Sequence, residues 1–268
     1  MGQCPFLASG LCGRLPRLSI PTVVTVHDLA FETRQAEELA RGRRPEVDPF
    51  PWIADAARRA TRVIATTEAA KRDLGTHYGI DAAKVRVIHY GVDPAFFSPE
   101  AGEKGLEAFW ARRELKEPYL LFMGPFDWEW RRHLFTCLEA VALLRKEGLA
   151  REKLVFVGAL TDYCRQIADR ADLLGLGQDL VWTGYLPRSE LPSLYRGARL
   201  FIHPVTHAFG LSVLEAMACG TPVVSSTDSG SGIPETVGDG ALLAEATDPA
   251  DIARAMRRAL GSEAARAA

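Results

Sequence analysis

The chain has 268 residues, of which 25% are charged and 47% are hydrophobic, values typical of a globular protein with one large or two modest domains. Its 32 Lys and Arg against 34 Asp and Glu give a formal net charge of -2, which excludes the basic excess expected of a nucleic-acid-binding protein. No apolar run reaches the roughly 18 residues of a membrane-spanning helix.

Short apolar runs alternate with longer helical stretches along the chain. Strands are predicted at residues 22–27, 62–66, 85–88, 119–123, 153–157, 180–183, 200–203 and 222–225. Helices are predicted at residues 50–60, 67–78, 134–147, 162–174, 189–196, 211–218 and 248–260. Several strands are apolar throughout, as expected when helices cover both faces of a parallel sheet. The alternation predicts an α/β fold with doubly wound parallel sheets.

Residues 93–117 interrupt this rhythm with two prolines and the charged run ARRELKE. Such a segment is typical of a linker between domains. We therefore expect a Rossmann-like N-terminal domain in residues 1–100, a linker in 101–117 and a Rossmann-like C-terminal domain in 118–268. The N-terminal region shows only about three strand signals, so its doubly wound domain is predicted to be incomplete.

The most informative stretch runs from His203, where a strand is predicted to end, to the helix at 211–218. The open N–H groups and dipole of a helix start attract anions, and Gly210 permits close backbone approach. Ser212 can cap this helix or offer its hydroxyl to the same anion. One turn later, the Glu215 carboxylate can accept two hydrogen bonds from a diol. The alternative is an ordinary helix with Glu215 on its solvated face.

A second stretch begins at Gly124, where another buried strand is predicted to end. Arg131 and Arg132 stand just before the next helix, and paired guanidinium groups at the carboxyl edge of a parallel sheet can clamp a diphosphate. The alternative is an exposed basic helix start. Because cations are disfavoured at that end of a helix, the placement favours a bound anion.

Two other strand ends are candidates for ligand contacts. After the strand at 180–183, the backbone of Tyr185 and Leu186 can contact the edge of a planar base. His27 ends a strand of the N-terminal region, where a satisfied structural histidine is the alternative to a ligand contact.

The cysteines and one basic run bear on location and partners. Five cysteines at scattered positions include no Cys-x-x-Cys pair and no zinc-type cluster, which predicts reduced thiols and a cytoplasmic location. The run RGRR at 41–44 predicts a solvated loop, with peripheral contact at the inner face of a membrane as the alternative.

The segments TVVTVHDLAF, RVIATTEAAKRDL, VRVIHYGVDPAFF, WTGYLP and HAFGLSVLEAMACGTPVVSS…GIPE resemble a known family. They are similar to the retaining GT-B glycosyltransferases of the glycosyltransferase 4, or glycosyl transferases group 1, family, over residues 22–260. The resemblance implies two Rossmann-like domains, a nucleoside-diphosphate sugar held mainly by the C-terminal one, and no required metal or cofactor.

The resemblance also implies roles for particular residues. Glu215 matches the second of the family's paired glutamates, which holds the donor ribose, and His27 matches a histidine that approaches the donor sugar. The residues matching the loop and helix start near the diphosphate and sugar are Phe209, Gly210, Leu211 and Ser212. The residues matching the turn that contacts the base are Tyr185 and Leu186. Gly124, which is also assigned to the donor site, begins a loop longer than the family's. This loop leads to Arg131 and Arg132, which fall near the Arg-Lys pair that neutralises the diphosphate.

The sequence departs from the family pattern at three places. His207 stands eight residues before Glu215, where the family has its other glutamate, so the contact with the transferred sugar is expected to differ. The family's opening strand and glycine-rich loop have no counterpart before Thr22. The last helix is expected to stop early, after Leu260. These departures predict a chain truncated at its N-terminus and shortened at its C-terminus.

The resemblance therefore predicts a hexosyltransferase. It would move mannose or glucose from a UDP- or GDP-linked donor to a glycan or lipid-linked acceptor with retention, using His27, Arg131, Arg132 and His207 near the reacting atoms. The alternatives are a non-catalytic nucleotide-sugar-binding fragment, or half of a split enzyme that needs a partner chain. A sugar epimerase or phosphorylase on the same scaffold is a third possibility.

Overall fold

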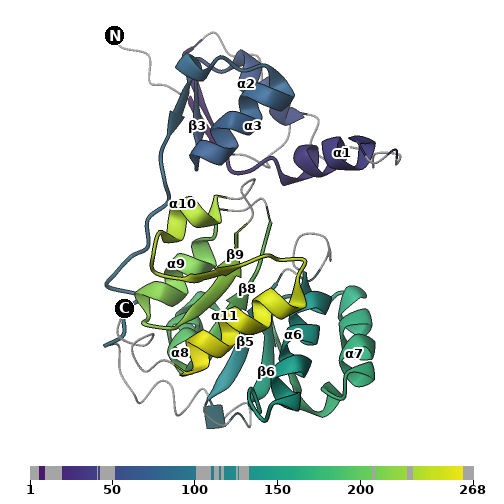
Figure 1. The fold of residues 1–268 in the computed structure, drawn as a ribbon. Coiled ribbons are helices and arrows are strands. Elements are labelled where there is room, and N and C mark those ends of the chain that lie inside the picture. The colour runs from purple at the N-terminus through teal and green to yellow at the C-terminus, as the bar shows by residue number, and fades with distance from the viewer. Residues whose placement is uncertain are drawn as a thin grey trace. The chain divides into compact units, whose positions relative to one another are not determined.

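The structure is a computed structural model that describes residues 6–9, 20–40, 42, 52–100, 110–111, 115, 118–124, 126, 133–206, 209–227 and 232–261. The chain divides into two compact units (Figure 1). The first comprises Met1–Gly91, His207–Phe209 and Ser229–Thr236, and the second comprises Val92–Thr206, Gly210–Asp228 and Val237–Ala268.

The first unit is built on a parallel sheet with strand order β1-β2-β3-β4. The strands are β1 (Phe6–Ser9), β2 (Thr22–Val26), β3 (Arg62–Ala65) and β4 (Val85–Val87). The helices are α1 (Ala30–Ala40), α2 (Trp52–Arg59), α3 (Glu68–Tyr78) and the 3-10 turn η1 (Ala82–Lys84). Thr67 begins α3 as predicted by accepting the Ala70 N–H with its hydroxyl at 3.0 Å.

The second unit is built on a parallel sheet with strand order β10-β9-β8-β5-β6-β7. The strands are β5 (Tyr119–Met123), β6 (Lys153–Val157), β7 (Leu180–Gly184), β8 (Ala198–His203), β9 (Val223–Ser226) and β10 (Leu242–Ala244). The helices are α6 (Leu134–Lys146), α7 (Tyr163–Leu173), α8 (Leu191–Gly197), α9 (Leu211–Ala218) and α11 (Pro249–Gly261), with the 3-10 turns η2 (Gly177–Asp179) and η3 (Arg188–Glu190). The short helix α10 (Ile233–Val237) follows β9 in the chain.

Both faces of the six-stranded sheet are covered by helices, as the apolar strands predict. Leu120 and Phe122 of β5 pack with buried side chains of α6, α7 and α11 on one face (Figure 1). Phe201 of β8 points to the other face, where its ring meets that of Tyr195 in α8 at 5.7 Å between centroids. The sheet is therefore doubly wound.

The order of the strands reverses between β5 and β8. From β5 the chain proceeds to β6 and β7 on one side, whereas β8, β9 and β10 lie on the other. In a doubly wound sheet, loops diverge at the carboxyl ends of the strands where the order reverses, and ligands bind there. Gly124 follows β5 and His203 ends β8, so these two residues border that position.

Two strands and two helices were not predicted. The expectation that no strand precedes Thr22 is wrong, because β1 pairs in parallel with β2 from Phe6 against Thr22. β10 pairs likewise with β9. Both are edge strands of three or four residues, too short for a hydrophobic pattern, and their backbone partners are distant in sequence. The helices α1 and α10 are the two missed in the sequence.

Candidate functional site

Glycines line the carboxyl edge of the six-stranded sheet. Gly124 follows β5, Gly158 follows β6, and Gly184 ends β7. A Cβ atom on Gly124 would lie 3.0 Å from the Phe126 nitrogen, and one on Gly158 would lie 3.1 Å from the Gly124 Cα. Packing of one loop backbone on the next therefore accounts for glycine at both positions, while a donor contact of Gly124 stays a prediction.

The start of α9 has the geometry that the sequence predicts. Gly210 is its N-cap residue with φ 88° and ψ 39°, a left-handed conformation that favours glycine. Val213 and Leu214 donate their N–H groups to the Gly210 carbonyl at 2.9 and 3.1 Å. The N–H groups of Leu211 and Ser212 precede these first helical bonds, so they are the ones that can meet an anion.

Ser212 does not cap its helix. Its hydroxyl lies 3.2 Å from Nε2 of His203, the last residue of β8, whose ring is buried and stacks on Phe201 at 5.0 Å between centroids. No side chain caps this end of α9 among the described residues. The helix start and the end of β8 are thus joined by the His203–Ser212 contact.

Glu215 lies one turn into α9 and is half-buried. Its Oε2 accepts a hydrogen bond of 2.9 Å from the hydroxyl of Tyr195, a fully buried side chain of α8. Burial raises the pKa of Glu215, whereas the Tyr195 hydroxyl and the Arg188 charge act to lower it. Glu215 therefore does not lie on a fully solvated face, and a ligand contact of its carboxylate stays a prediction.

Arg188 and Tyr195 are neighbours of Glu215 that the sequence analysis missed. The Arg188 guanidinium carbon lies 5.2 Å from the ring centroid of Phe96 and 5.9 Å from that of Phe97, which are distances of cation–π contacts. Nothing in the sequence marks Arg188 or Tyr195, since each belongs to a segment separate from α9.

The turn after β7 divides the two residues predicted to contact a base. Gly184 has φ 69°, Tyr185 is 81% exposed, and Leu186 is buried at 4% exposed. The Tyr185 side chain is therefore open to a ligand, whereas Leu186 can offer only its backbone. The base contact itself stays a prediction.

In the first unit, His27 stands at the carboxyl end of the sheet as predicted. Its Nδ1 contacts the Tyr90 hydroxyl, and the two rings lie 5.7 Å apart between centroids. The His27 carbonyl accepts the Thr66 hydroxyl at 2.6 Å. Phe209, which this unit includes, is buried and meets Tyr90 edge-on at 4.9 Å between centroids. Tyr90 was not singled out in the sequence.

Gly124, Tyr185, Leu186 and Phe209 apart, the predicted residues fall into three groups. The structure brings Gly210, Leu211, Ser212 and Glu215 together on α9, and it places His27 in the other unit. Arg131, Arg132 and His207 lie outside the described residues, as do Arg41, Arg43 and Arg44.

The described residues bear on metals and membranes in two ways. They hold no group of three or more His, Cys, Asp or Glu side chains placed to bind a metal ion. None of their helices is both long enough and apolar enough to cross a bilayer.

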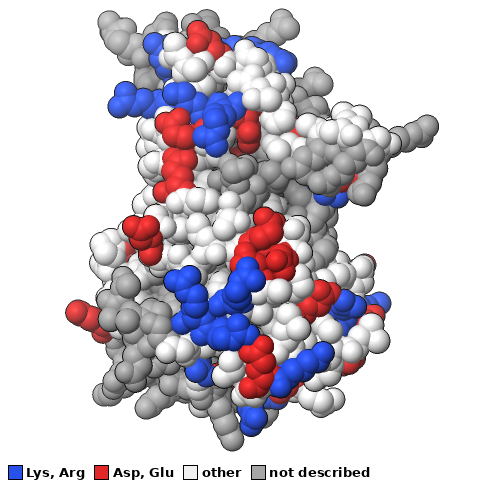
Figure 2. Space-filling view, viewed as in Figure 1, with Lys and Arg blue, Asp and Glu red and all other residues white. Residues whose placement is uncertain are grey.

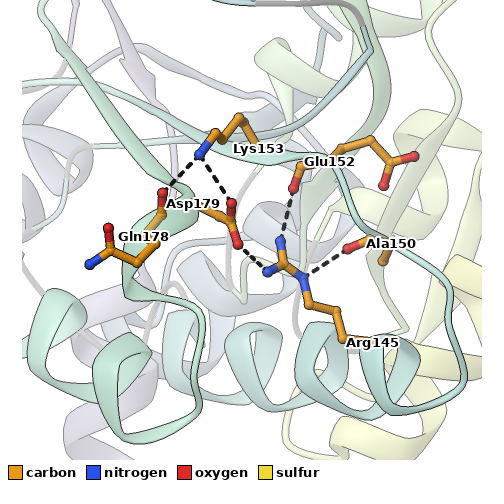
Figure 3. A network of polar contacts seen from close by, with 6 residues as sticks. All are labelled: Arg145, Ala150, Glu152, Lys153, Gln178 and Asp179. Atoms are coloured by element: carbon orange, nitrogen blue, oxygen red, sulfur yellow. Dashed lines mark hydrogen bonds and ion pairs between the residues drawn. The ribbon is translucent and has the colours of Figure 1, made fainter.

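The amino edge of the same sheet carries a network of polar contacts (Figure 3). Arg145 of α6 pairs with Asp179 and donates to the carbonyls of Ala150 and Glu152 at 3.0 and 2.9 Å. Lys153 reaches Asp179 at 3.1 Å. Burial acts to raise the pKa of Asp179, but hydrogen bonds and charges from Arg145 and Lys153 lower it overall. These contacts tie α6 to the starts of β6 and β7.

A cavity of about 260 Å³ opens at this amino edge, lined in part by Arg199 and Arg257. Arg199 pairs with Glu152, and Arg257 pairs with Glu147 at 2.6 Å. On the face drawn in Figure 2, basic side chains gather over α11 with acidic ones beside them. Because carboxylates already pair with these two arginines, the cavity is no candidate for the predicted diphosphate site.

Comparison with known proteins decides the family. Residues 117–262 match the family model described as "Glycosyl transferases group 1", and residues 3–96 match "Glycosyltransferase Family 4". The chain belongs to the glycosyl transferases group 1 family. This confirms the resemblance seen in the sequence.

One curated relative matches nearly the whole of this glycosyltransferase-family chain, and another matches about half of it. A D-inositol 3-phosphate glycosyltransferase of Salinispora arenicola is 33% identical over 268 residues, which are 94% of this chain and 58% of the relative. An O-antigen chain mannosyltransferase B of Escherichia coli is 37% identical over 134 residues, 48% of this chain and 33% of the relative. The chain thus spans little more than half the length of the first relative.

Solved structures show the same fold. Anabaena Alr3699/HepE, in complex with UDP and glucose, has a TM-score of 0.73 at 20% identity, covering 92% of this chain and 64% of that one. WaaG, a glycosyltransferase involved in lipopolysaccharide biosynthesis, has a TM-score of 0.75 at 19% identity, covering 97% and 70%. The fold is GT-B, with Rossmann-like parallel sheets, as predicted.

Proposed function

We propose that this chain transfers a hexose from a nucleoside-diphosphate sugar to a hydroxyl-bearing acceptor with retention of configuration. Family membership supports glycosyl transfer. The observation that most favours a donor site in this chain is the half-buried Glu215, one turn behind the left-handed Gly210 at the start of α9. An anion-attracting helix start and a carboxylate on one short helix suit a diphosphate joined to a ribose.

The donor would be divided among three elements of the second unit. The N–H groups of Leu211 and Ser212 would meet the diphosphate, and the Glu215 carboxylate would accept hydrogen bonds from the ribose hydroxyls. The exposed Tyr185 ring would lie beside the base. The roles of His27 and His207 near the transferred sugar stay predictions.

Stabilising the departing diphosphate is the main demand of the reaction. The bond between the sugar C1 and the phosphate oxygen breaks, the acceptor oxygen bonds to C1, and its proton passes to the departing phosphate oxygen. The positive end of α9, with Arg131 and Arg132, would stabilise the negative charge that develops. Because the helix start and the two arginines would stabilise this negative charge, the proposed reaction uses no metal and no cofactor.

The substrates proposed here follow the names of the relatives. D-inositol 3-phosphate is the first acceptor to test, and a mannose-containing glycan is the second. UDP is the first nucleotide to test, because the HepE complex holds it, and GDP is the second. The cytoplasmic location and the contact of residues 41–44 with a membrane stay predictions.

A second candidate function is donor binding without transfer. His207 favours it, because the family places a glutamate there, and an imidazole cannot reproduce a carboxylate's hydrogen bonds to the transferred sugar.

The proposal is tested with the full chain in two steps. Thermal shift with UDP, GDP, ADP, UDP-glucose and GDP-mannose should show one nucleotide family raising the melting temperature, since preferential binding stabilises the folded state. NMR of the product formed with D-inositol 3-phosphate or a mannoside should then show the donor's anomeric configuration. Stabilisation without transfer or donor hydrolysis would favour the second candidate, and no stabilisation by any nucleotide would overturn both.

A further inference from the structure

Both the ring and the backbone carbonyl of Tyr195 are fixed by contacts inside the second unit. Its side chain is completely buried against Phe97 and Phe201, with ring centroids 6.1 and 5.7 Å away. Its carbonyl accepts the Thr221 hydroxyl at 2.7 Å, which ties the end of α8 to the turn after α9. The ring therefore cannot swing away from α9 without disrupting the core.

A buried tyrosine hydroxyl needs a hydrogen-bond partner, and here the partner is a carboxylate. The Tyr195 hydroxyl donates to Oε2 of Glu215 at 2.9 Å, and it is the one donor to that carboxylate among the described residues. A carboxylate offers about four lone-pair sites on two oxygens, so Oε1 and part of Oε2 stay available. A vicinal diol, which presents two adjacent O–H donors, fits that remaining capacity.

We propose that Tyr195 is a positioning residue that orients the Glu215 carboxylate for the ribose diol of the donor and keeps it ionised. The inference rests on the proposed function, because it takes the ribose as the ligand of Glu215. Tyr195 acts through Glu215 and need not touch the donor.

The groups around Glu215 support this role. Burial raises the pKa of Glu215, and the Tyr195 hydroxyl opposes that rise, with the Arg188 charge as a further lowering influence. Burial also raises the pKa of Tyr195 well above its ordinary value and that of Cys219 to about 11, so both stay protonated at neutral pH. The phenol therefore remains a donor wherever Glu215 is ionised.

The decisive variant is Tyr195→Phe, which removes the hydroxyl and keeps the ring. The pKa of Glu215 should rise, because a hydrogen bond that favours the ionised carboxylate is lost. Losing one such bond should weaken UDP binding roughly five-fold at neutral pH. The loss should grow as the pH falls, since Glu215 becomes protonated at a higher pH than in the wild-type chain.

Tyr119→Phe is the matched control. Tyr119 is equally buried and donates its hydroxyl at 2.5 Å to a neutral acceptor, the carbonyl of Leu194, the residue next to Tyr195. It should lower stability to a similar extent and leave the pH profile of UDP binding unchanged. In Glu215→Gln, UDP binding should not change with pH near the Glu215 pKa. The same should hold for the double variant that also carries Tyr195→Phe.

Two readouts separate this inference from the proposed function. NMR titration of ¹³C-labelled glutamate carboxyls, with Glu215 assigned through Glu215→Gln, measures the Glu215 pKa without any nucleotide. An unchanged pKa in Tyr195→Phe would overturn the role of Tyr195 alone. Calorimetry with UDP and GDP tests the ligand, and a wild-type chain that binds neither would overturn the proposed function and the ribose contact together.

Discussion

The two edges of the six-stranded sheet use their polar groups differently. At the amino edge, Arg145, Lys153 and Asp179 satisfy one another and nearby carbonyls (Figure 3). At the carboxyl edge, the first N–H groups of α9 and the remaining capacity of Glu215 face no such partners among the described residues. The amino edge is thus expected to stabilise the fold, and the carboxyl edge to bind the ligand.

The largest expected effect comes from breaking the amino edge. Arg145→Ala removes an ion pair and two hydrogen bonds to carbonyls from a side chain that is 19% exposed. The free energy of unfolding should fall by about 3 kcal/mol, because two carbonyls and Asp179 lose a donor. Urea denaturation measures this. Arg165→Ala, at an exposed position, is the control and should change little. Weakened UDP binding by folded Arg145→Ala protein would contradict the division between the edges.

Glu215→Ala tests the carboxyl edge, where the expected loss is mainly in nucleotide binding rather than in stability. Nucleotide binding should weaken by about 2 kcal/mol, roughly 30-fold, through the loss of hydrogen bonds to the carboxylate. Unfolding should change less than in Arg145→Ala, because one buried donor, the Tyr195 hydroxyl, loses its acceptor. Calorimetry with UDP measures the first effect. Glu100→Ala, an exposed carboxylate of the same unit, is the control, and equal affinities of both variants would remove Glu215 from the site.

Gly210→Ala should have a smaller effect on both properties. The left-handed φ of 88° at the N-cap of α9 costs about 1 kcal/mol for a residue with a Cβ atom, so stability should fall by that amount. Nucleotide affinity should fall as the helix start shifts. Gly261→Ala, where a Cβ would meet open space and no left-handed φ occurs, is the control. If both alanine variants unfold alike, the strain assigned to Gly210 is absent.

The smallest expected effect is a pH dependence at the amino edge. The pKa of Asp179 is lowered in the folded chain, so its contribution to stability is complete above the pKa of the unfolded chain. That contribution should be lost as the pH falls through the lowered value, because the folded state must then take up a proton. Asp179→Asn should flatten the stability profile in this acidic range, as measured by denaturation at a series of pH values. A profile identical to that of the wild-type chain would show that the ion pairs contribute nothing.

The accuracy of the sequence predictions depended on how local each signal was. β5, β6 and α9 begin and end at the predicted residues, because a continuous apolar run or a glycine before an apolar helix is a local pattern. β1 and β10 were missed because such short edge strands exist only through pairing with β2 and β9.

In the candidate site, too, only the residues that lie close together in the chain were predicted. Gly210 and Glu215 share one helix, so their spacing along the chain already placed them one turn apart. Tyr195 lies 20 residues before Glu215, and Arg188 is farther still. No spacing rule connects residues on separate elements, so their roles were not predicted. Likewise, Ser212 was expected at the cap of α9 or on an anion. The structure places its hydroxyl beside His203 rather than at the cap, and the anion contact stays a prediction.

The sequence by itself determined the alternation of strands and helices, the parallel sheets, the glycine before α9 and the resemblance to the family. Each of these follows from residues close together in the chain. Only the tertiary structure decided the strand order, its reversal between β5 and β8, the left-handed conformation of Gly210, and the partners of Glu215 and Asp179. These depend on which distant segments pack together, and burial and hydrogen-bond satisfaction act on those contacts after the chain has folded.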